Sequence, residues 1–345
     1  MKLVSPLLKH VVYPAFHYSG QLSRIPLSGG CVAINYHGVL PPDHLDADPF
    51  LDGNLVRVEQ FRRQLQFLKL RYQVISPDDF RSWIEQGAPL PPSAALITCD
   101  DGLLNTLTDM LPVLQTEDVR CLFFVTAASC GNHPGMLWYE ELHHLMRAKP
   151  LTDAESQLPT EDGTTTASEG MHARWWSAVR RASRLEAAAR ADWIALLRSS
   201  RKTPDSSGSE RRWRLLNATE LTQLAAAGMT IGAHTVSHPV LSLCSDAEAK
   251  REIQASKAEI ERVLGQTSWA FAYPFGDFLT MGQREMHLAQ ESGFSCAFLN
   301  ILNGPPDRPK RFELPRVHVT LDMKLPEFAA HVSGLHARLQ RAVRG

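Results

Sequence analysis

Short apolar runs rich in β-branched residues recur along this chain, and amphipathic stretches separate them. This alternation is typical of parallel strands that are buried beneath crossover helices. We therefore predict an α/β fold with about eight strands. The candidate strands are residues 31–36, 73–76, 94–99, 120–126, 229–233, 268–273, 294–299 and 314–319.

Two of the intervening stretches, residues 58–70 and 246–264, carry apolar side chains at helical spacing, and the second ends at Gly265. Eight strands that alternate with helices favour a barrel over an open sheet. No GxGxxG or GxxxxGK[ST] motif follows a candidate strand, which argues against a nucleotide-binding open sheet. The apolar faces consist of Phe61, Leu65 and Leu68 in the first stretch, and Ile253, Ile260, Val263 and Leu264 in the second.

Residues 150–213 interrupt this alternation. The segment begins with an acidic part rich in Thr and Ser, continues with two amphipathic stretches, and ends in another polar part. We interpret it as a helical insertion, because it is too short to bury a large core alone. Its tryptophans, such as Trp176 and Trp193, either pack on the barrel or line the approach to a site.

Composition limits the class of protein. With 345 residues, 44% of them hydrophobic, the chain can bury a large core, and a net charge of −1 gives no bulk attraction to nucleic acid. Its six cysteines include no CxxC pair, which favours a reducing, cytoplasmic compartment. The apolar run near the N-terminus contains a proline and leads to no small-residue cleavage site, so we expect no signal peptide.

Two adjacent carboxylates follow an apolar strand in the stretch ALITCDDG. Asp100 and Asp101 come at the carboxyl end of the strand, and Gly102 permits a tight turn there. In barrels the active site lies at this end of the strands. The alternative is a pair of aspartates that begins a turn or caps a helix.

Two histidines, His234 and His238, stand four positions apart at the end of another apolar strand. Two imidazoles at this spacing commonly bind a metal, although two surface histidines in a loop would look the same. Catalytic zinc prefers three protein ligands and an open position, so one aspartate can complete the ligand set and the other can act as the base. Attraction to the metal would also offset the repulsion between adjacent acids.

The ordered stretches TCDDG, HTVSH and YPFG make the sequence resemble the polysaccharide deacetylases, carbohydrate esterase family 4 with the NodB-homology domain. The resemblance implies a distorted (β/α)7 barrel. We assign this barrel to residues 31–345, with the helical insertion at 150–213, after a basic segment at 1–30. It further implies that Asp100 is the general base. The implied metal ligands are Asp101, His234 and His238, with Zn²⁺ or another divalent ion such as Co²⁺.

Two features depart from the pattern of the family. The arginine of the third motif is replaced by Ala272, and we expect Arg316, from another strand end, to supply the guanidinium beside the base. No C-terminal L-x-H motif is present to supply a catalytic histidine, and the C-terminal candidates are His318 and His336.

The stretch INYHGV offers a better candidate for the catalytic acid. It resembles the YH motif of the subgroup that acts on poly-N-acetylglucosamine, which makes His37 the expected acid. The third motif shapes a turn, and the resemblance implies that the Phe275 N–H faces the developing oxyanion, with Tyr273 beside it in substrate binding.

The predicted activity is hydrolysis of a carbon–nitrogen bond other than a peptide bond: removal of N-acetyl groups from an amino-sugar polysaccharide or a lipid-linked glycan. The alternatives are an amidohydrolase for a small non-glycan amide and an inactive glycan-binding relative. Both chain ends are basic, which would suit contact with anionic lipid at the cytoplasmic face of a membrane. The other interpretation of these ends is a solvated helix face.

Overall fold

Parallel strands form the centre of the molecule in a computed structural model, which describes residues 6–24, 30–45, 47–132, 135–152, 155, 170–201, 210–301 and 310–344. Seven strands follow one another around the sheet in the order β10-β1-β5-β6-β7-β8-β9, and β4 pairs with β5 off this path. Their bounds are β1 (Cys31–Tyr36), β4 (Gln73–Val74), β5 (Ala94–Cys99), β6 (Cys121–Val125), β7 (Thr230–Ala233), β8 (Ala270–Ala272), β9 (Cys296–Phe298) and β10 (Arg316–His318).

The two ends of this path meet. A single parallel bridge joins Phe298 in β9 to Leu314, two residues before β10. The predicted distorted (β/α)7-type barrel is therefore confirmed, and each of the eight predicted runs contains a strand. The strands at 31–36 and 94–99 match the prediction residue for residue, because six register pairs along their whole length hold them together.

Helices cover the outside of the barrel. The predicted helices appear as α2 (Val58–Arg71) and α11 (Asp246–Leu264). Phe61, Leu65, Leu68, Ile253 and Ile260 are fully buried under them. The other covering helices are α3 (Pro77–Gln86), α4 (Leu111–Thr116), α10 (Ala218–Ala226), α12 (Gln283–Glu291) and α13 (Leu325–Val332).

One small element was not predicted. Strands β2 (Val39–Leu40) and β3 (Val56–Arg57) form a separate parallel pair between β1 and α2. Two residues per strand are too few to show a period in sequence, so no pattern could reveal this pair.

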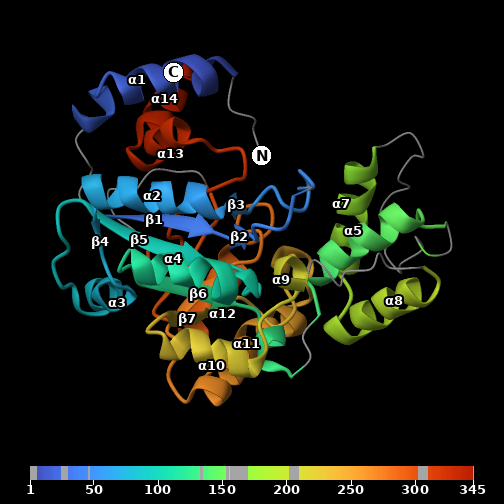
Figure 1. Ribbon diagram of the computed structural model, residues 1–345. Coiled ribbons are helices and arrows are strands. Elements are labelled where there is room, and N and C mark those ends of the chain that lie inside the picture. Colours follow the sequence, from blue (N-terminus) through green and yellow to red (C-terminus); the bar gives the residue numbers. More distant parts are fainter. Residues whose placement is uncertain are drawn as a thin grey trace.

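The insertion forms a helical lobe at one side of the barrel, at the right of Figure 1. Helices α7 (Met171–Ala182) and α8 (Ala187–Ser199) pack with α5 (Trp138–Ala148), which begins before residue 150, and share a hydrophobic cluster of their own. The short helix α9 (Glu210–Trp213) leads back to the barrel. The buried members of this cluster include Leu142, Leu145, Val179, Ile194 and Leu197.

The two ends of the chain pack together. Helix α1 (Tyr13–Tyr18) contacts α13, and α14 (Leu335–Arg344) follows α13, so that all three lie above the barrel in Figure 1. The ammonium of Lys9 lies 2.5 Å from Asp322 and 3.2 Å from Glu327. This basic residue of the N-terminal segment is therefore paired with acids near the C-terminus.

The six cysteines are all free thiols, and five are buried. Within the described part of the chain, no helix has both the length and the apolar character needed to cross a bilayer.

Candidate active site

Side chains from several strand ends line one cavity of about 970 Å³ at the carboxyl end of the barrel. His37 follows β1, Asp100 and Asp101 follow β5, and His234 follows β7. Because all these strands are parallel, their carboxyl ends meet at the same rim. The barrel thus brings together residues that are up to 200 positions apart in the sequence.

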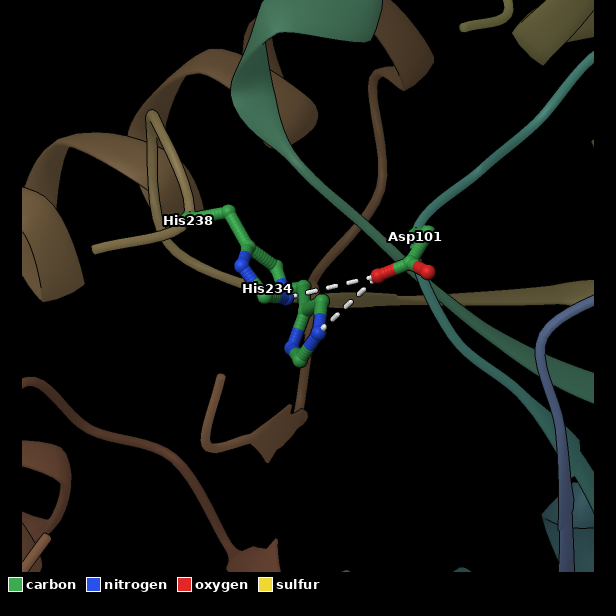
Figure 2. A group of neighbouring side chains, drawn as sticks. All are labelled: Asp101, His234 and His238. Carbon is green, nitrogen blue, oxygen red and sulfur yellow. Dashed lines mark ion pairs between the residues drawn. The ribbon is translucent and has the colours of Figure 1, made fainter. Parts of the chain in front are cut away.

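Asp101, His234 and His238 have ligand atoms that all lie within 4.8 Å of one another (Figure 2). Asp101 Oδ1 is 3.5 Å from His234 Nε2 and 3.4 Å from His238 Nε2. Two ligand atoms at 2.0–2.1 Å from a tetrahedral ion are about 3.4 Å apart. The spacing of these atoms therefore fits a tetrahedral divalent metal such as zinc.

The hydrogen bonds at the site leave His234 Nε2 and Asp101 Oδ1 free to bind a metal. His234 Nδ1 lies 2.7 Å from the carbonyl oxygen of Ala272, which directs Nε2 toward Asp101. Among the described residues, Asp101 Oδ1 has no hydrogen-bond partner, although it is buried. An unpartnered buried carboxylate oxygen between two imidazoles is consistent with a metal ligand.

The backbone at the site adopts conformations that are rare outside glycine. Asp101, Thr235, His238 and Phe275 have φ angles of 75°, 64°, 56° and 60°. Such angles cost energy and persist only where the surroundings hold them, and they cluster at functional sites. Gly102 is also left-handed, with φ of 79°, and a Cβ there would come within 2.9 Å of Val125.

Three side chains hold the loop that carries the two histidines. On α11, Glu252 accepts hydrogen bonds from the N–H groups of Val236 and Ser237 at 2.8 and 2.9 Å and from the Ser237 hydroxyl. Arg190 of α8 donates to the Ser237 hydroxyl, and Trp138 of α5 donates to the His238 carbonyl at 3.2 Å. Barrel and insertion therefore both support this loop.

Asp100 is paired with Arg316, and both side chains are almost completely buried. The guanidinium donates in parallel to the two carboxylate oxygens, Nη1 to Oδ1 and Nη2 to Oδ2, each at 2.7 Å. Asn35 donates to Oδ2 at 2.9 Å. Burial alone would raise the pKa of Asp100, but the charge and hydrogen bonds of Arg316 hold it below its usual value. Arg316 thus lies at the predicted position beside the acid, in place of the arginine that Ala272 replaces.

His37 lines the cavity beside these groups, with Nε2 at 3.9 Å from Asp100 Oδ2. Burial lowers the pKa of His37, while the charges of Asp101 and Asp100 act in the opposite direction. The ring of His318 lies 5.0 Å from that of His37, and burial lowers the pKa of His318 to about 3. His336 also lines the cavity, but Tyr13 and Gln340 occupy both its nitrogens at 2.5 and 2.8 Å.

The turn of the third motif brings one predicted residue to the cavity and leaves another out. Phe275 lines the cavity, and its ring lies 4.8 Å from that of His238. Within the described residues, the backbone N–H of Phe275 has no acceptor. The Tyr273 side chain does not line the cavity, which corrects our expectation of a role in substrate binding. Strand alternation turns it with Phe271 into the core, where its hydroxyl donates to the Phe312 carbonyl at 3.2 Å.

The cavity also contains residues that the sequence analysis missed. Tyr139 and Glu140 come from α5, Trp175 from α7, and Arg212 from α9. Trp175 and Trp176 of the insertion therefore line the cavity, the second of the two roles considered for its tryptophans, whereas Trp193 packs against the hydrophobic cluster of the lobe. Trp176, one of these, contacts the ring of Phe275 at 5.2 Å. No motif marks Glu140 or Arg212, because their contacts depend on the folding of the insertion against the barrel.

Comparisons with known proteins agree with this geometry. The family model described as Polysaccharide deacetylase matches residues 202–293, which include His234, His238 and the YPFG turn. Among curated proteins, none matches the chain. The matched segment leaves Asp100 and Asp101 outside.

Several solved structures share the fold. IcaB from Ammonifex degensii has a TM-score of 0.56 at 18% identity, with 88% of this chain and 97% of that chain covered. The deacetylase PplD from Streptococcus pyogenes has a TM-score of 0.53 at 15% identity, with 89% and 99% covered. A de-N-acetylase from Aggregatibacter actinomycetemcomitans has a TM-score of 0.54 at 13% identity, with 88% and 99% covered.

At these identities the structural likeness shows the fold alone. Membership of the subgroup with the YH motif stays a prediction. The match of the family model to the segment with both histidines, on a barrel of this topology, nevertheless confirms the resemblance. Over residues 202–293, and in the fold of its barrel, the chain is similar to the polysaccharide deacetylases.

Proposed function

We propose that the protein is a metal-dependent hydrolase that removes N-acetyl groups from an amino-sugar polysaccharide or a lipid-linked glycan and releases acetate. One observation carries this proposal. The three candidate metal ligands, which we call the triad, lie in one cavity with the buried carboxylate of Asp100, which is paired with Arg316. A divalent metal at the triad would act as a Lewis acid and lower the pKa of water.

Residues of the chain supply the base, the contact with the oxyanion and the acid. Asp100, which Arg316 keeps ionised, accepts a proton from the water that attacks the acetyl carbonyl carbon. The backbone N–H of Phe275 is free to donate to the oxygen that becomes negative. When the carbon–nitrogen bond breaks, the amine nitrogen takes a proton from His37, and acetate and a free amino sugar result.

His37 is favoured as the acid over the other two histidines of the cavity. Both nitrogens of His336 are already hydrogen bonded, and in the described part of the chain it is His37, not His318, whose ring nitrogen lies within 4.0 Å of Asp100. The His37 ring lies beside Asp100, and its Nδ1 has no partner among the described residues.

The walls of the cavity favour a glycan over a small amide. Trp175, Trp176 and Phe275 line its interior, and Phe50 and Phe278 at its lining are 60% and 59% exposed. Aromatic faces of this kind pack against the apolar faces of sugar rings, and a volume of about 970 Å³ exceeds what a small amide fills. The buried Asp100–Arg316 pair also argues against an inactive binding relative. A cytoplasmic location and contact of the basic termini with anionic lipid stay predictions.

Acetate release from N-acetylglucosamine oligomers tests the proposal. The metal-free protein would be assayed with added Zn²⁺, with Co²⁺ and without metal, next to His238→Ala and the surface variant His287→Ala as its matched control. We expect metal-dependent release of acetate from the native protein and from His287→Ala. We expect none from His238→Ala. Full activity of His238→Ala would rule the scheme out, and release from a small acetamide but from no oligomer would favour the amidohydrolase.

A further inference from the structure

The wall of the cavity includes a buried ion pair that the proposed mechanism does not use. Glu140 of α5 and Arg212 of α9 are 5% and 1% exposed, and both line the cavity that contains Asp100 and Asp101. Arg212 Nη2 donates to Glu140 Oε1 at 3.2 Å. Two ionisable side chains, one from α5 before the insertion and one from α9 within it, thus face the cavity of the barrel.

Arg212 has a second acidic partner behind the cavity. Its Nε donates to Asp52 Oδ1 at 2.5 Å, and its Nη2 donates to the Leu51 carbonyl at 2.7 Å. Asp52 is completely buried and already balances the charge of the guanidinium. Glu140 is therefore an additional acid in a cavity that three aspartates, Asp100, Asp101 and Asp277, already line, and a structural role in neutralising Arg212 does not explain it.

Both members of the pair have hydrogen-bonding capacity left over. Arg212 Nη1 and Glu140 Oε2 are buried and, among the described residues, have no hydrogen-bond partner. A buried charged group without a partner costs free energy, so these atoms call for a ligand or water. One atom donates and the other accepts, which matches a hydroxyl group, since a hydroxyl does both.

We propose that Glu140 and Arg212 form a sugar-binding site that recognises hydroxyl groups of the amino-sugar ring, with Arg212 Nη1 as donor and Glu140 Oε2 as acceptor. This inference rests on the proposed function, because it assigns a hydroxylated ring to the same cavity. The pair acts on substrate binding and orientation and takes no part in proton transfer. A substrate without a sugar ring should not depend on it.

Glu140→Gln tests the inference, because it replaces one carboxylate oxygen with an amide nitrogen, which cannot accept a hydrogen bond, and leaves the Arg212–Asp52 pair intact. Glu141→Gln is the matched control: the neighbouring acid on α5 pairs with Arg198, and neither residue lines the cavity. Each variant would be assayed for acetate release from N-acetylglucosamine oligomers and from p-nitrophenyl acetate, with zinc content and melting temperature measured in parallel.

We expect Glu140→Gln to lower kcat/KM for the oligomer roughly tenfold or more, mainly through KM, as for a lost hydrogen bond to a charged group. The rate of ester hydrolysis and the zinc content should equal those of the native protein. Glu141→Gln should leave the activity on both substrates unchanged. Arg212→Lys should repeat the selective loss.

Two outcomes would count against the inference in different ways. In the first, the native protein releases acetate from the oligomer while Glu140→Gln keeps full activity, or loses activity on the oligomer and the ester equally. In either case the sugar-binding role is wrong while the proposed function stands. If the native protein releases no acetate from any oligomer, the proposed function fails and this inference falls with it.

Discussion

Single side chains at this site are held by contacts that leave each with one orientation. Arg316 shows this most clearly. Its Nε donates to the Leu299 carbonyl at 2.9 Å, and its two terminal nitrogens donate to the carboxylate of Asp100. The guanidinium also lies 5.4 Å from the ring centroid of Phe124. A planar fork with several donors can make all these contacts at once, which a lysine cannot.

Asp100→Asn should separate metal binding from turnover. Asparagine keeps the shape of the side chain but cannot accept the proton, so we expect kcat to fall by roughly 10²- to 10⁴-fold with zinc content unchanged. Asp101→Asn should instead lose zinc and activity together. Elemental analysis and acetate release on the two proteins check this, and loss of zinc from Asp100→Asn would mean that the two roles are assigned wrongly.

Arg316→Lys should change the pH dependence of the reaction. Because Arg316 holds the pKa of Asp100 below its usual value, loss of the paired contact should raise that pKa. The base would then be protonated over a wider acidic range, so the acidic limb of the kcat/KM profile should move to higher pH. A profile that falls in height without moving would show that Arg316 does not control the ionisation of Asp100.

At the scale of elements, the loop between β7 and α11 depends on helices that come from different parts of the chain. Glu252 on α11 and Arg190 on α8 meet at Ser237, between the two histidines. This arrangement compensates for the left-handed backbone of Thr235 and His238. The insertion therefore contributes to the geometry of the candidate metal site as well as to the cavity wall.

Glu252→Ala should weaken metal binding. Without the carboxylate, the N–H groups of Val236 and Ser237 lose their acceptor, and the loop no longer holds both imidazoles in place. Loss of a group that orients metal ligands typically lowers affinity 10- to 100-fold. Competition with a chromophoric zinc chelator measures this, and Glu259→Ala, at an exposed position of the same helix, is the control. Native zinc affinity in a folded Glu252→Ala protein would contradict the prediction.

At the scale of the whole molecule, the two chain ends form one cluster above the barrel. Tyr13 of α1 packs against His331 of α13 and His336 of α14, with ring centroids 6.3 and 6.1 Å away. Burial, with the nearby charges of His336 and Lys9, lowers the pKa of His331 to about 3. This ring is therefore neutral in the folded protein.

The free energy of unfolding should consequently fall in mild acid. An unfolded histidine has a pKa of about 6.5, so the stabilising contribution of neutral His331 is complete above that value and decreases as the pH falls toward 3. Between pH 7.5 and 5 the loss should be about 2 kcal/mol for this residue. Denaturant unfolding at the two pH values measures it, and His331→Asn should reduce the difference whereas His287→Asn, a surface histidine, should not.

Sequence patterns predicted the parts of this protein that repeat with a local period or follow a strand directly. The eight strand positions, helices α2 and α11, and the candidate ligands after β5 and β7 all belong to this group. The predicted ligands proved to be neighbours because parallel strands in a barrel end at a common rim. The prediction for Tyr273 was wrong because a motif does not tell which way a side chain turns at the end of a three-residue strand.

What the sequence determined by itself is therefore the alternation of strands and helices and the chemical types of residue at the strand ends, since both depend on neighbours within a few positions. Only the tertiary structure decided that Arg316 reaches Asp100 and that α5, together with α7 and α9 of the insertion, lines the cavity. These contacts join residues far apart in the chain, and the packing of whole elements, which no local pattern encodes, sets their distances.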